Sequence, residues 1–184
     1  MQKGQAKLES IRNRLPHRSD LLAVLSVTVF FSYSWTLLIF LYKLSSFLLY
    51  FTLGEVADIF TFMMAFTLLE SLAVMGVLVL LSVILPSSWL RNGFAFKGFV
   101  IVSIATVTSI LFQKTLDDYP STWALVLFSL VPLAAIVGLI AMVRSRPRLL
   151  QLLNNIQDRI LIMLYVYVPL GLLSLAVVLY RNLL

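Results

Sequence analysis

The sequence predicts an all-α, polytopic integral membrane protein: a bundle of five transmembrane helices with interfacial amphipathic helices. Hydrophobic residues make up 61% of the 184 residues and charged residues only 12%, whereas soluble domains are roughly 45–50% apolar and about 25% charged. The apolar residues also fall in long runs separated by short polar turns. A run of about 20 apolar residues is long enough to cross a bilayer.

Residues 1–20 are predicted to form a basic cytoplasmic tail, part of which lies on the membrane as an amphipathic helix. Leu8, Ile11 and Leu15 recur at helical spacing among basic residues, and Pro16 would end the helix. A basic tail that only sets the topology is an equal alternative. Residues 21–184 are expected to form one transmembrane domain, with spans at about 21–42, 60–85, 94–113, 122–143 and 160–180.

Two segments between the spans are expected to lie in the membrane interface. Residues 44–51 are apolar but too few to span, which predicts a separate interfacial or re-entrant piece. Thr52 and Glu55 then form a capping-box pattern, so the second helix should begin near Leu53. Residues 149–160 alternate apolar and polar faces at helical spacing, which predicts an amphipathic helix that can run directly into the fifth span.

Five spans put the two termini on opposite sides of the membrane, and the basic residues predict which side is which. Eleven Lys and Arg residues fall on the N-terminal side, and only Lys43, Lys114 and Arg181 fall on the other. Cytoplasmic loops carry the excess of Lys and Arg. We therefore expect a cytoplasmic N-terminus and an external C-terminus, in a plasma membrane of the bacterial type.

Glu70 is the centre of the functional prediction, because it is an acid in the middle of the predicted second span. An ionisable side chain at that depth is costly and is a functional candidate by default. No Lys, Arg or His lies at the same depth in any span, whereas several hydroxyl groups do. We expect a hydrogen-bonded intramembrane cluster that joins the first three spans and contains Glu70, Ser32, Tyr33, Ser34, Thr36, Thr67, Thr106 and Ser109.

Several roles are open for this cluster. Its hydrogen bonds can simply hold the helices together. Glu70 can instead contact a basic or polar group of a partner membrane protein, in which case it should face outward beside Met63, Phe66 and Val77. A water-filled cavity reaching Glu70 would favour proton or cation handling, and a polar lipid site is a further option.

The basic residues on the N-terminal side are a second candidate site. They can hold anionic lipid headgroups at the membrane surface, although as topology signals they need no further role. The residues expected to make this contact are Arg144, Arg146, Arg148 and Lys97. The acids on the other side, Glu55, Asp58, Asp117 and Asp118, could bind a divalent cation, but acidic turns are also what the charge bias leaves there, so we expect no metal and no cofactor.

Catalytic functions find little support in the sequence. The chain has no cysteine and one histidine, His17, which lies in the polar tail. No motif for a nucleophilic serine, a zinc hydrolase or a phosphate-binding loop is present, and the spans hold one acid where an aspartyl dyad needs two. We therefore expect no enzyme and no nucleic-acid binding.

The leading functional prediction is a non-catalytic accessory or scaffold subunit of a larger membrane complex. Its expected partners are the lipid bilayer and either other membrane protein subunits or further copies of the chain. One alternative is a small transporter or channel-like protein that uses Glu70 with the Ser, Tyr and Thr groups. The second alternative is a lipid-binding or lipid-modifying membrane protein.

Overall fold

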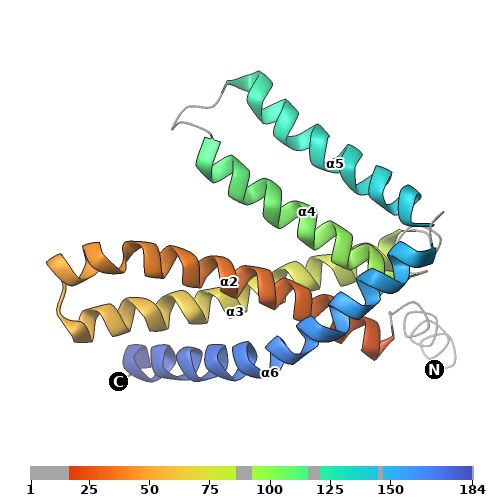
Figure 1. Cartoon of the computed structure of the whole chain (residues 1–184). Coiled ribbons are helices and arrows are strands. Elements are labelled where there is room, and N and C mark those ends of the chain that lie inside the picture. The colour runs from red at the N-terminus through yellow and green to blue at the C-terminus, as the bar shows by residue number, and fades with distance from the viewer. Residues whose placement is uncertain (1–16, 86–92, 116–120, 145–146, 184) are drawn as a thin grey trace, which may run out of the picture.

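Five helices make up the fold, shown in Figure 1 as a computed structural model that describes residues 17–85, 93–115, 121–144 and 147–183. Each helix is long and apolar enough to cross a membrane, and the described residues contain no strand. The predicted all-α architecture with five such helices is therefore confirmed, while the tail predicted over residues 1–16 lies outside the described ranges. The helices are α2 (Arg18–Tyr50), α3 (Leu53–Ile84), α4 (Phe94–Thr115), α5 (Thr122–Arg144) and α6 (Pro147–Leu183).

Successive helices run in opposite directions, so the first and last described residues lie at opposite ends of the bundle (Figure 1). We call the end where α2 begins the N-terminal end and the end where α6 finishes the C-terminal end. The turn between α2 and α3 lies at the C-terminal end, as do the finish of α4 and the start of α5.

The first two helices meet at a tight, capped turn, which corrects one expectation from the sequence. Residues 44–51 are not a separate interfacial or re-entrant piece, because α2 continues through Tyr50 and stops only where Phe51 turns extended. No glycine or proline interrupts this stretch, so the helix has no reason to end earlier. The predicted capping box is present: the backbone N–H of Thr52 donates to the Glu55 carboxylate over 2.8 Å, and the backbone N–H of Glu55 donates to the Thr52 hydroxyl over 3.4 Å.

The amphipathic segment before the fifth span is the first part of the same helix, α6, and not a separate element. Figure 1 shows α6 changing direction along its length. Pro169 lies inside the helix, and a proline removes one backbone hydrogen bond and crowds the preceding turn, which bends a helix. Residues of the second half of α6, such as Tyr167 and Leu175, pack against α2 and α3.

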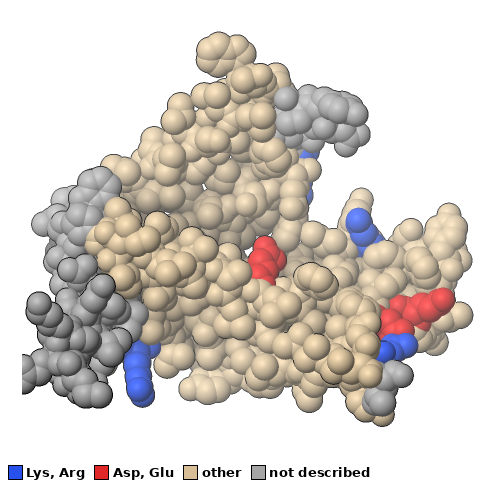
Figure 2. Space-filling model, turned by 180° about the vertical axis from the view of Figure 1, so that it is seen from behind, with Lys and Arg blue, Asp and Glu red and all other residues tan. Residues whose placement is uncertain are grey.

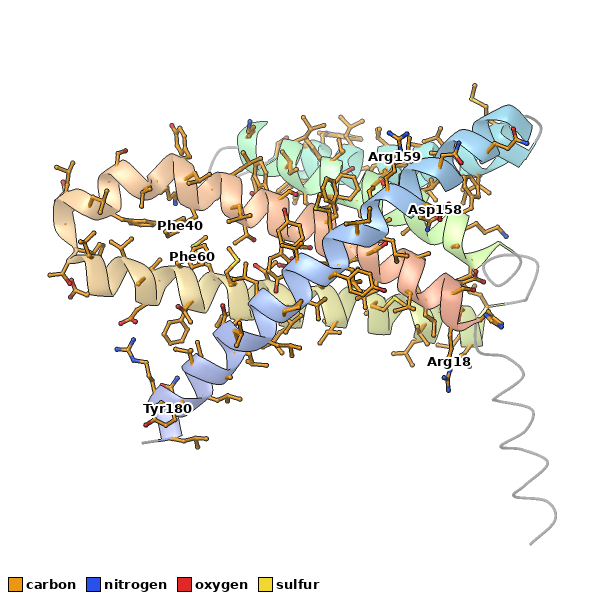
Figure 3. All side chains as sticks on the ribbon, turned by 60° about the horizontal axis from the view of Figure 1, so that its bottom comes forward. Arg18, Phe40, Phe60, Asp158, Arg159 and Tyr180 are labelled. Atoms are coloured by element: carbon orange, nitrogen blue, oxygen red, sulfur yellow. The ribbon has the colours of Figure 1, made fainter. Side chains whose placement is uncertain are left out.

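Helices α2, α3 and α6 pack against one another and form the core of the bundle. One buried cluster joins Val29 and Tyr33 of α2 to Met64 and Leu68 of α3, with residues of α6 packed against it. Nearer the C-terminal end, the rings of Phe40 and Phe60 meet edge to face at 5.0 Å, as Figure 3 shows.

Helices α4 and α5 form an arm beside this core. Helix α4 packs mainly on α2, near the N-terminal end, where Gly98 lies against Val24 so closely that a Cβ at position 98 would fall 2.5 Å from one Val24 methyl carbon. Toward the C-terminal end the arm diverges from α2 (Figure 1). Helix α5 packs chiefly on α4, and none of the residues in its most apolar stretch is buried within the chain.

Candidate functional site

Tyr33 is the hydrogen-bonding centre of the three-helix core. Its hydroxyl donates to the backbone carbonyl of Met64 on α3 over 3.1 Å, and its ring, which is fully buried, stacks on Tyr167 of α6 with centroids 5.0 Å apart. The space for the hydroxyl exists because residue 171 of α6 is a glycine, whose missing Cβ would collide with that oxygen. Tyr33 therefore ties α2, α3 and α6 together, with Gly171 as the residue that permits it.

Thr36 and Thr67 make a second polar contact between α2 and α3. Their hydroxyl oxygens lie 2.9 Å apart. Thr67 also donates its hydroxyl proton to the carbonyl of Met63 over 2.7 Å, so Thr36 must be the donor in the bond between the two threonines. The structure thus brings together three residues of the predicted cluster, Tyr33, Thr36 and Thr67, at the junction of α2 and α3.

Glu70 does not join these residues. Its side chain is exposed, and it makes no hydrogen bond or ion pair with any residue in the described part of the chain. The reason is rotational: three residues advance a helix by about 300°, so Glu70 lies about 60° around α3 from Thr67. It falls on the same stripe as Phe66 and Val77, which are 67% and 55% exposed. Glu70 therefore faces outward beside Phe66 and Val77, whereas Met63, which was expected on the same exposed face, is half-buried.

The rest of the predicted cluster lies apart from Glu70. Ser32, Ser34 and Thr106 are half-buried and Ser109 is exposed; none of the four hydrogen-bonds to Glu70. Figure 2 shows acidic atoms surfacing in the middle of the rear face, within an otherwise uncharged area. The hydrogen-bonded group is therefore a structural junction, and the carboxyl lies outside it.

Charged residues form an ion pair at the C-terminal end of the bundle and are exposed on the first half of α6. At the C-terminal end, Arg181 of α6 pairs with Asp58 of α3, and both side chains are partly exposed. On the first half of α6, Asp158 and Arg159 are exposed (Figure 3). Of the residues expected to contact anionic lipid, Lys97 is half-buried at the start of α4. Arg146 and the side chains of Arg144 and Arg148 lie outside the part that the structure describes.

Two residues of α6 matter more than their sequence context indicated. Gln157 is buried and its side-chain amide donates to the carbonyl of Ala95 over 3.3 Å, which ties α6 to α4. Tyr167 supplies the stacking partner of Tyr33. The spacing of Tyr167 and Gly171 by four residues puts both on one helix face, but the sequence carries no signal that this face meets Tyr33.

Among the described residues, Glu70 lines neither of two pockets that lie elsewhere in the bundle. The larger, of about 340 Å³, lies between α4 and α5. The smaller lies beside the Asp58–Arg181 pair. Within residues 17–85, 93–115, 121–144 and 147–183, no three acidic or histidine side chains come close enough to hold a metal ion. Asp117 and Asp118 are outside these ranges.

Comparison with known proteins finds no relative of this chain. The chain matches no protein-family model, no curated protein and no solved structure.

Proposed function

We propose that this protein is a non-catalytic membrane subunit that binds another membrane protein through the face of α3 around Glu70. The observation that carries the proposal is the exposed carboxyl of Glu70, which has no partner in the described part of the chain and stands among exposed apolar side chains. A charged residue at the centre of a transmembrane helix costs about 2.5–3.5 kcal/mol on insertion scales. A partner that hydrogen-bonds the carboxyl removes part of that cost.

The chemistry of Glu70 indicates what the partner offers. The carboxyl is best satisfied by a cation or a strong hydrogen-bond donor at the same depth. A second copy of this chain supplies no such cation from the described residues: Lys43, Lys97 and Lys114 lie toward the helix ends, and Arg159 lies twelve residues before Gly171, which packs at the level of Leu68. The partner is therefore a different membrane protein, with a transmembrane helix that carries Lys, Arg, His, Asn or Gln near its middle.

The apolar residues beside Glu70 shape the contact but do not argue for it by themselves, since lipid covers apolar surface equally well. Phe66 and Val77 flank the carboxyl along the helix and are exposed. The contact then combines one polar anchor with shape-matched apolar packing.

The test compares the full chain with Glu70 variants after purification from native membranes in mild detergent. Glu70→Leu should lose a specific membrane protein that the wild type retains, and Glu70→Gln should weaken the complex, because an amide keeps a hydrogen bond but not the charge. Asp158→Asn is the matched control, since it neutralises an exposed acid outside this face. Reversing both charges, with Glu70→Lys and an acid in the partner, should restore binding.

A complex that survives Glu70→Leu unchanged would contradict the proposal. So would a stoichiometric complex that contains only copies of this chain, because the proposed partner is a different membrane protein.

A further inference from the structure

The side of α4 that packs on the core changes in character along the helix. Near the N-terminal end this side is apolar, and Phe94 and Val102 are buried in one cluster with Val24 of α2. Seven residues advance a helix by about 700°, so Ser109 lies within about 20° of Val102 around α4. The side that meets the core therefore continues as a polar stripe, which consists of Thr106, Ser109 and Gln113.

This polar stripe loses its cover where the arm leaves the core. Thr106 is half-buried, and Ser109 and Gln113 are exposed, in the part of α4 that diverges from α2 in Figure 1. None of the three side chains makes a hydrogen bond with any residue in the described part of the chain. By contrast, Thr61 of α3 and Ser129 of α5 each donate to a carbonyl of their own helix, over 2.8 Å.

The polar stripe lies at nearly the same depth in the bundle as Glu70. Leu78 of α3 and Val102 of α4 mark a common level, because both belong to the same buried cluster. From that level toward the C-terminal end, Glu70 is eight residues away along α3 and Ser109 is seven residues away along α4. These separations are about 12 Å and about 10 Å at about 1.5 Å per residue. Both residues lie within apolar spans, and the core of a bilayer holds no water to satisfy a polar side chain.

Lipid is a poor neighbour for the polar stripe, because an acyl chain neither donates nor accepts a hydrogen bond. Helix α5 shows the contrast: its large exposed side chains are apolar, as at Leu127, Leu130 and Leu133. The stripe offers two hydroxyls and an amide and no charge, and it extends over two turns of α4. Neutral polar side chains of a second transmembrane helix, such as Asn, Gln, Ser or Thr, match both its chemistry and its length.

We propose that a transmembrane helix of the partner lies along the polar stripe, on the side where the arm diverges from the core, and hydrogen-bonds to Ser109 and Gln113 through neutral side chains. The inference rests on the proposed function, since it assigns a second contact to the membrane protein that binds Glu70. The shared depth of Glu70 and the polar stripe allows one partner to reach both. The two contacts differ in chemistry, because Glu70 selects a cation or strong donor and the stripe selects neutral polar groups.

The experiment is photo-crosslinking from α4, with the full chain in native membranes. A benzophenone side chain replaces Phe112, which is half-buried and lines the pocket between α4 and α5 together with Ser109 and Gln113. In the matched control it replaces Val107, which is 51% exposed and lies about 200° around α4 from Ser109. Position 112 should give an adduct with the same membrane protein that crosslinks beside Glu70, and position 107 should give none.

Two substitutions test whether the polar groups make the contact. Ser109→Ala combined with Gln113→Leu should lower the yield of the adduct from position 112 about eightfold, which corresponds to two interhelical hydrogen bonds of about 0.6 kcal/mol each. The isolated variant should be as resistant to unfolding as the wild type, because neither side chain is hydrogen-bonded within the described part of the chain. An unchanged yield, or a loss of stability in the isolated variant, would refute the contact.

A parallel crosslink from position 66, which is exposed on α3 beside Glu70, separates this inference from the proposed function. If position 66 gives a protein adduct and position 112 gives only lipid or small-molecule adducts, the inference fails and the contact at Glu70 stands. If position 112 gives the protein adduct and position 66 does not, the role proposed for Glu70 fails and the contact at α4 stands without it. An adduct between position 112 and a second copy of this chain would overturn the choice of occupant.

Discussion

Replacing Gly171 by alanine is the sharpest test of the packing around Tyr33. The Cβ of an alanine at this position would fall well inside van der Waals contact with the Tyr33 hydroxyl oxygen and 3.1 Å from the Cβ of Leu68. The hydroxyl cannot move freely, because it is buried, donates to the Met64 carbonyl, and belongs to a ring stacked on Tyr167. The substitution therefore forces either the hydrogen bond or the α6 backbone to shift.

The expected loss of stability combines two destabilising contributions and one stabilising contribution. Overpacking a well-filled site costs about 1–3 kcal/mol. A lost hydrogen bond between membrane helices adds about 0.6 kcal/mol on average and up to about 1.7 kcal/mol. Alanine favours a helix interior over glycine by roughly 0.5–1 kcal/mol. We expect Gly171→Ala to lower the free energy of unfolding by about 1–4 kcal/mol.

The assay is reversible unfolding in mixed micelles of a mild detergent and sodium dodecyl sulfate, followed by the loss of helical signal. Gly138→Ala is the matched control, because a Cβ at Gly138 of α5 meets nothing within 4 Å, and it should cost no stability. Tyr33→Phe removes the oxygen that collides with the new methyl group, so the double variant should recover part of the loss. If Gly171→Ala unfolds like Gly138→Ala, or if Tyr33→Phe gives no recovery, the proposed packing around Tyr33 is refuted.

Three smaller perturbations test the other contacts in the same assay. Thr36→Val leaves Thr67 without its donor and should cost about 0.6 kcal/mol; a loss above about 2 kcal/mol would show that this contact does more than join two helices. Asp58→Asn should change stability by less than about 1 kcal/mol, because its pair with Arg181 is partly exposed, and a larger loss would show that the pair is a major stabilising contact. Gln157→Leu leaves a carbonyl of α4 without its side-chain donor, so it should cost about 1 kcal/mol, and an unchanged unfolding curve would count against the contact.

The helices could be predicted from the sequence because apolar length is a property of a single segment. The turn after Tyr50 could also be predicted, because the capping box of Thr52 and Glu55 is a local sequence pattern. The prediction of a separate piece over residues 44–51 is wrong. A lysine such as Lys43 indicates where a helix reaches the membrane edge, but the helix itself can continue beyond that point. Helix α2 continues beyond it as ordinary helix.

Only part of the candidate site could be predicted from the sequence. Depth placed Glu70 level with the hydroxyl groups of the first span, but depth does not fix rotation about the helix axis. Each residue turns a helix by about 100°, so Thr67 points to Thr36 while Glu70 points outward. The contact of Gly171 with Tyr33 could not be derived either, because it depends on how α6 bends and crosses two other helices.

The most direct test of the proposed contact at Glu70 is site-specific photo-crosslinking from α3 in native membranes. A benzophenone side chain replaces Phe66, which is exposed and one helical turn from Glu70, and in a matched control it replaces Leu133, which is exposed on α5. We predict one discrete protein adduct from position 66, formed with a different membrane protein and lost in Glu70→Leu, and no such adduct from position 133. Only lipid adducts from position 66, or a protein adduct that persists in Glu70→Leu, would contradict a partner-binding role for this face.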